Sequence, residues 1–119
     1  MSLTVSVIGV NKVIKKLDLS KKEIQNAVFE SVKETAKFVE RRAKQIVPVD
    51  TGRLKSSIQI SNLTKNPASA EIGTNVEYAG FVEFGTKFMA KHLYLTNASF
   101  EGEKFIKKDL KQRIKNIIE

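Results

Sequence analysis

The longest regular pattern of apolar residues in the chain runs through residues 20–47. Within it, apolar side chains recur at steps of three and four and form one stripe of a helix: Ile24, Val28, Val32, Ala36, Val39, Ala43 and Ile46. Ser20 and Glu23 have the spacing of a capping box at the start. Pro48 disfavours helical geometry at Val47 and ends the helix. The pattern predicts one amphipathic helix of about 26 residues, or about 39 Å.

Three further segments have the pattern of strands. Residues 3–8 alternate apolar and polar side chains and are rich in β-branched residues. Residues 57–63 also alternate, and residues 68–73 follow a loop that contains a proline, so the two segments are predicted to form a hairpin. The apolar positions of the first hairpin strand are Ile58, Ile60 and Leu63. Because the long helix must cover most of one face of the sheet, we expect the strands to form a single layer.

Two shorter helical patterns flank these elements. Residues 10–17 have apolar side chains at helical spacing and predict a short helix. Near the other end, apolar residues predict an amphipathic C-terminal helix with a basic outer face: Phe105, Ile106, Leu110, Ile114, Ile117 and Ile118. The predicted fold is therefore α+β, with one long amphipathic helix packed across a small, mostly antiparallel sheet and a C-terminal helix. A chain of 119 residues is expected to form one domain, residues 1–119.

Residues 76–88 hold much of the aromatic content and are interrupted by Gly80 and Gly85. The aromatic residues are Tyr78, Phe81, Phe84 and Phe88. Four rings in so short a segment are more than one face of a small core usually needs. Two interpretations are open: the rings line the core, or some of them are exposed for contact with a neighbouring subunit.

Composition and charge narrow the possible functions. The chain has no cysteine, which excludes disulfides, thiol catalysis and cysteine-based zinc sites. No apolar run of about 18 residues is present, so we expect no membrane partner. The net charge of +8 would attract polyanions such as nucleic acid. However, the basic residues are spread along the chain, and residues 76–88 carry two glutamates against one lysine.

The candidates for chemistry are few. His92 is the only histidine, and carboxylates are not clustered near it at the spacing of metal ligands. Glu83 lies among aromatic residues, where a carboxylate could act as a general acid; the alternative is a structural Glu83 that accepts hydrogen bonds from backbone amides or from a lysine or arginine. No catalytic triad order, phosphate-binding glycine loop or nucleotide motif is present. We therefore expect no enzyme activity, no catalytic, cofactor-binding or metal-binding residue, no cofactor and no small-molecule substrate.

Three segments in order, residues 48–58 (PVDTGRLKSSI), 78–86 (YAGFVEFGT) and 93–98 (LYLTNA), resemble the gene-product-ten-like tail-component family of long-tailed phages. The family pattern is a long helix, a Pro-x-Asp-Thr-Gly-x-Leu turn, a strand pair and a Tyr-Ala-x-x-x-Glu-x-Gly-Thr segment. The resemblance extends from the helix at residue 20 to the last helix. The third segment departs from the pattern, because Leu93 and Asn97 stand where the family usually has prolines. The residues that match the motifs are Pro48, Asp50, Thr51, Gly52, Leu54, Tyr78, Ala79, Glu83, Gly85 and Thr86.

The resemblance implies an α+β fold and a structural role at the head–tail junction of a phage or prophage, as a neck or tail-completion protein that forms a ring. The implied partners are further copies of the chain and the neighbouring connector and tail proteins, with DNA only as cargo passing through the lumen. The implied location is the virion, and the host cytoplasm during assembly. We interpret the motif residues as framework and expect the subunit interface to include Tyr78, Phe81, Phe84 and Phe88. The alternative function is a basic nucleic-acid-binding module.

Overall fold

A computed structural model describes residues 3–6, 22–49, 52–65, 67–88 and 90–118, and its long axis measures 53 Å against 21 Å for each of the other two. In chain order the elements are β1 (Leu3–Ser6), α2 (Lys22–Ile46), α3 (Arg53–Ser57), β2 (Gln59–Lys65), β3 (Ala68–Thr74), α4 (Ala79–Phe84) and α5 (Tyr94–Ile118). The predicted first strand is confirmed for Leu3–Ser6. The predicted helix at residues 10–17 and the capping serine, Ser20, lie outside the described residues.

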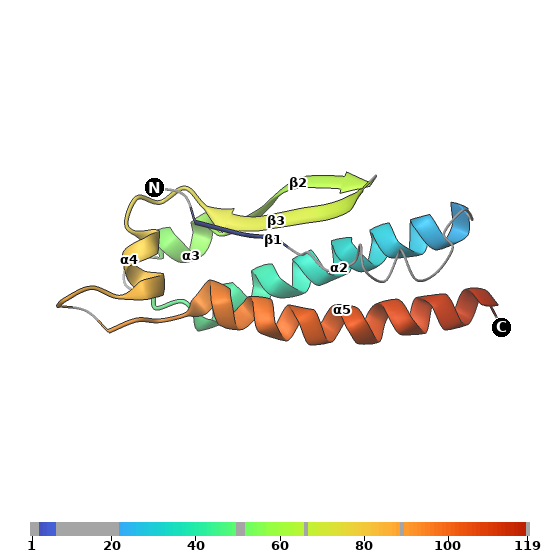
Figure 1. The fold of residues 1–119 in the computed structure, drawn as a ribbon. Coiled ribbons are helices and arrows are strands. Elements are labelled where there is room, and N and C mark those ends of the chain that lie inside the picture. The colour runs from blue at the N-terminus through green and yellow to red at the C-terminus, as the bar shows by residue number, and fades with distance from the viewer. Residues whose placement is uncertain (1–2, 7–21, 50–51, 66, 89, 119) are drawn as a thin grey trace.

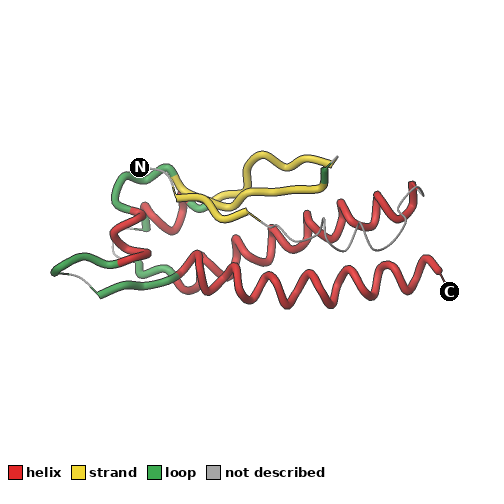
Figure 2. The backbone as a smooth tube through the Cα atoms, viewed as in Figure 1, coloured by secondary structure: helices red, strands yellow, loops and turns green. Residues whose placement is uncertain are grey.

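The elements form two layers (Figure 1; Figure 2). The sheet has the strand order β1-β3-β2, and both pairs are antiparallel. Helices α2 and α5 run in opposite directions, side by side along the long axis, and the sheet covers one side of this helix pair. The α+β prediction is therefore confirmed, as are the single layer of strands and the hairpin of β2 and β3.

Helix α2 provides the largest part of the core. Six of the seven apolar side chains predicted to form its stripe are buried, and the last, Ile46, is partly buried against the core. The helix ends at Ile46, two residues before Pro48, as predicted. Two polar side chains of the same helix, Ser31 and Thr35, are also fully buried, which the apolar pattern did not indicate.

The hairpin differs from the prediction at its first strand. Strand β2 begins at Gln59, because the five residues before Ile58 form the short helix α3. Leu63 was predicted to be an inward position and is 41% exposed. Leu63 is an odd number of residues from the inward Ile60, so regular alternation places it on the outward side. The pairing with β3 also shifts register between Ser61 and Thr64, where Asn62 takes a positive φ of 49°, so β2 carries a bulge here.

Helix α5 begins at Tyr94, eleven residues before the predicted apolar pattern at Phe105. Its first turns are part of the core, since Tyr94, Leu95 and Ala98 are fully buried. Farther along, a Cβ atom added to Gly102 would lie 2.4 Å from Cγ2 of Val39, so the glycine permits the close approach of α5 to α2.

Side chains also join the two long helices. The Arg42 guanidinium donates to both carboxylate oxygens of Glu101, at 2.7 and 3.1 Å. The rings of Phe38 and Phe105 stack with their centroids 4.8 Å apart. These contacts cross between α2 and α5, so the helix pair is held by polar and aromatic contacts in addition to the buried apolar stripe.

Candidate functional site

The first motif segment is a turn that leads from α2 into α3. Gly52 has a φ of 82°, which is readily accessible only to glycine, and it directly precedes α3. Leu54 is buried in α3, whereas Pro48 is exposed. Asp50 and Thr51 lie outside the described residues. The described part of the motif therefore turns the chain and anchors α3 in the core.

The second motif segment is α4 with the residues on either side of it. Its central residue, Glu83, is 1% exposed. One carboxylate oxygen of Glu83 accepts a hydrogen bond from the backbone N–H of Thr96 at 2.8 Å, and the other accepts from the N–H of Leu95 at 3.2 Å. The first N–H groups of a helix have no partner within the helix and carry a partial positive charge. Glu83 therefore acts as the N-terminal cap of α5 from a distant position in the sequence.

Further contacts fix α4 against the start of α5. The Tyr94 hydroxyl donates to the carbonyl oxygen of Ala79 at 3.1 Å, and the backbone N–H of His92 donates to the carbonyl of Val82 at 2.9 Å. Burial, together with the nearby charge of Glu83, raises the pKa of Tyr94 above its ordinary value, so the hydroxyl keeps its proton and remains a donor.

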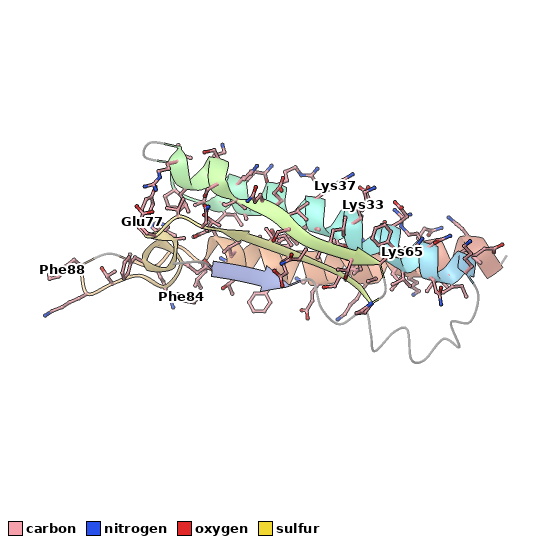
Figure 3. The ribbon with its side chains drawn as sticks, turned by 90° about the horizontal axis from the view of Figure 1, so that it is seen from above. Lys33, Lys37, Lys65, Glu77, Phe84 and Phe88 are labelled. Carbon is pink, nitrogen blue, oxygen red and sulfur yellow. The ribbon has the colours of Figure 1, made fainter. Side chains whose placement is uncertain are left out.

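Two backbone features end α4. Gly85 has a φ of 77° and its N–H donates to the carbonyl of Phe81 at 2.8 Å. Next to it, the Thr86 hydroxyl accepts from the N–H of Phe88 at 3.1 Å. Gly85 and Thr86 thus end α4 and turn the chain toward the end of the long axis where Phe88 lies (Figure 3).

An ion pair joins the first motif segment to Glu77, the residue directly before the second motif segment. The Arg53 guanidinium donates to both carboxylate oxygens of Glu77, at 3.0 and 2.9 Å, and lies 5.6 Å from the centre of the Tyr78 ring. The hydrogen bonds from Arg53 hold the pKa of Glu77 below its ordinary value. Tyr78 itself is half-buried and packs against the core.

Three other aromatic rings of residues 76–88 are exposed. Phe81 and Phe84 are 54% and 60% exposed, and Phe88 is 91% exposed. Phe81 and Phe84 are three residues apart on α4 and therefore lie on the same side of it, opposite the buried Glu83. Phe84 and Phe88 lie toward one end of the long axis (Figure 3). Of the two interpretations of the aromatic surplus, core lining is therefore wrong for these three residues, which we call the aromatic tip.

His92 and Glu83 are the two residues considered above for metal binding or catalysis. Within the described residues, no three histidine, aspartate or glutamate side chains are placed to hold a metal ion. His92 is exposed, and both carboxylate oxygens of Glu83 already accept backbone hydrogen bonds. None of the described helices is both long and apolar enough to span a membrane.

These features define a small α+β protein whose motif residues hold backbone segments together and leave aromatic rings exposed at one end. Comparison with protein families finds a match over residues 11–85 to a family described as "Bacteriophage HK97-gp10, putative tail-component". The chain therefore belongs to this phage tail-component family. The match includes α2 through α4 and ends before α5, so it is shorter than the resemblance seen in the sequence, and residues 93–98 lie outside it. No curated protein and no solved structure matches the chain.

Proposed function

We propose that the protein is a structural, non-enzymatic subunit of the head–tail junction of a phage or prophage, a neck or tail-completion protein that assembles into a ring through its aromatic tip. The observation that carries the proposal is the exposure of Phe81, Phe84 and Phe88 in a member of a tail-component family. Several large apolar side chains exposed near one another in the sequence are typical of an interaction surface.

The size of the tip supports a protein partner. A phenylalanine ring buries about 150–250 Å² when it is fully covered, so the exposed fractions of the three rings amount to roughly 400 Å². A stable interface buries about 800 Å² on each partner. The tip thus has the size of the apolar centre of an interface, and polar residues around it would supply the rim.

The distribution of charge supports a second copy of the chain as that partner. Copies with a net charge of +8 repel one another unless they meet at a region without excess positive charge. Residues 76–88 carry little excess positive charge at their surface, since Glu77 is paired with Arg53, Glu83 is buried, and Lys87 is their other exposed charge. A ring requires each tip to contact a different surface of the next copy, because a tip that contacts another tip closes a dimer.

The proposed assembly has further partners. The ring would contact the connector proteins on the head side and the tail proteins on the other side, in the virion and, during assembly, in the host cytoplasm. Ring formation can depend on those neighbours as a template.

Particle assembly tests the proposal. In a phage or prophage that lacks the gene, we expect electron microscopy to show unjoined heads and tails, and expression of the natural chain to restore complete particles. The double variant Phe81→Ser, Phe84→Ser should fold but fail to restore them. Phe100→Ser is the control, because Phe100 is 61% exposed and lies on α5, outside the tip. Complete particles with the double variant would overturn the proposed role of the tip, and complete particles without the gene would overturn the proposed function.

A further inference from the structure

The solvent-facing side of α5 is a surface of a different kind. Five exposed lysines recur on it at steps of three and four: Lys104, Lys107, Lys108, Lys111 and Lys115. Residues at these steps lie on one side of a helix. Among the described residues from Glu103 to the end of α5, Glu103 is the only exposed acidic side chain. We call the five lysines the lysine face; the helix that carries them lies on the side of the molecule away from the sheet (Figure 1).

Four of the five lysines have no hydrogen bond or ion pair to a carboxylate of the described residues, although the charge of Lys104 acts on nearby Glu101. These four are Lys104, Lys107, Lys108 and Lys111. The half-buried acids of α5 are used elsewhere, since Glu101 binds Arg42 and Asp109 binds Arg113 at 2.7 Å. Four positive charges therefore remain available to an anionic partner.

The composition of the face favours nucleic acid over protein as that partner. Protein interfaces are depleted in lysine and have an apolar centre, whereas interfaces with DNA are polar and strongly positive. From Glu103 to Asn116, the exposed side chains of α5 are lysines, one glutamate and two amides, with no apolar residue among them. Single strands are commonly held by aromatic rings between basic residues, whereas the exposed ring on this side of α5, Phe100, comes before the first lysine and not between the lysines.

We propose that the lysine face binds the phosphate backbone of double-stranded DNA without reading its sequence. From Lys104 to Lys111 the helix rises about 10 Å, which matches the distance spanned by about four successive phosphates along one strand. Lysine is a point charge without the forked geometry that selects a base. The two amide side chains on this face, Gln112 and Asn116, hydrogen-bond to each other at 3.0 Å. The proposal does not depend on self-association through the aromatic tip.

Binding to a fluorescently labelled DNA duplex, measured by anisotropy at several salt concentrations, tests the proposal. If four lysines contact phosphates, the logarithm of the association constant should fall with the logarithm of the salt concentration with a slope of about −3.6. In the variant with Gln at Lys104, Lys107, Lys108 and Lys111, we expect affinity at low salt to fall by about 100-fold or more and the slope to approach zero.

A charge-matched control separates a binding surface from the effect of overall charge. It carries Gln at four lysines outside α5: Lys22, Lys33, Lys55 and Lys65. This control should keep most of the affinity and the slope of the natural chain. Equal weakening of both variants would overturn the proposal, because net charge alone would then explain binding. Polyglutamate that binds as tightly as DNA and depends on the same lysines would also overturn it, in favour of an acidic protein partner.

Discussion

Removal of the Glu83 carboxylate is the sharpest test of how the second motif segment holds the fold. Glu83 is buried, and its two oxygens accept hydrogen bonds from the N–H groups of Leu95 and Thr96 at the start of α5. Glu83→Gln keeps the size of the side chain but removes the charge and one of the two acceptor oxygens. Glu83→Ala removes both acceptors and leaves a cavity.

The expected cost follows from these contacts. A hydrogen bond to a charged group contributes about 1.5–3 kcal/mol, and a charge at a helix N-terminus adds about 0.3–1 kcal/mol. Glu83→Gln loses one such bond and the charge, so we expect the free energy of unfolding to fall by about 2–3 kcal/mol. Glu83→Ala also leaves a second N–H group unsatisfied, and we expect a fall of about 3–5 kcal/mol.

Urea denaturation followed by circular dichroism measures both effects, with Glu103→Gln as the control. Glu103 is exposed on α5, so the same chemical change there should alter stability by less than about 0.5 kcal/mol. A Glu83→Gln protein within about 0.5 kcal/mol of the natural chain would refute the reasoning, since such a change is typical of a surface residue without a partner.

Three further predictions concern the contacts of α5. Gly102→Ala gains about 1 kcal/mol of helix propensity, but its Cβ atom meets Val39 at 2.4 Å; we expect a net loss of about 1–2 kcal/mol in urea denaturation, which Val39→Ala in the same chain should relieve. Arg42 lowers the pKa of Glu101 in the folded protein, so their ion pair stabilises the fold above the ordinary pKa of glutamate, and this stabilisation is lost as the pH falls through the lowered value. The unfolding temperature of Glu101→Gln should therefore be lower than that of the natural chain at neutral pH and equal to it in acid. A difference in unfolding temperature that persists at low pH would contradict the assignment. Tyr94→Phe removes a buried hydrogen bond and should cost about 1–2 kcal/mol in urea denaturation, whereas an unchanged stability would mean that the bond contributes nothing.

The sequence predicted most of the fold where regular patterns persist. The stripe of α2 continues over seven apolar positions, and six of them are buried because the whole helix lies against the sheet and α5. The returning strand β3 alternates buried and half-exposed residues throughout its length. Long periodic segments of this kind carry enough information to fix both the type of element and its inward side.

Elements that depend on distant residues were predicted less well. The start of α5 has no local capping signal, because its cap is Glu83, which lies in another helix. Glycine has a low helix propensity, so the sequence around Gly102 does not favour a helix. The structure explains this glycine, because the Val39 side chain occupies the space that a Cβ atom at residue 102 would need. Leu63 was predicted to face inward, but it stands three residues after Ile60, and an odd step along a strand leads to the opposite side.

The site was predicted in part. A structural Glu83 bound by backbone amides was one of two alternatives from the sequence, and the hydrogen bonds of its carboxylate match that alternative. Exposure of some aromatic rings was one of two interpretations from the sequence, and a helix of six residues is too short for its pattern to indicate whether Phe81 and Phe84 face the core. Tyr78 differs from the three exposed rings because Arg53 and the core cover it.

The mass of the protein in solution, measured by light scattering over a concentration series, tests the central claim most directly. The series is run with and without the proteins encoded by adjacent genes, and with Phe84→Ser and Phe100→Ser, which remove rings that are 60% and 61% exposed. We predict a closed oligomer, formed by the chain alone or with those neighbours, that is lost in Phe84→Ser and retained in Phe100→Ser. A monomer under every condition, or an oligomer that both variants retain, would contradict assembly through the aromatic tip.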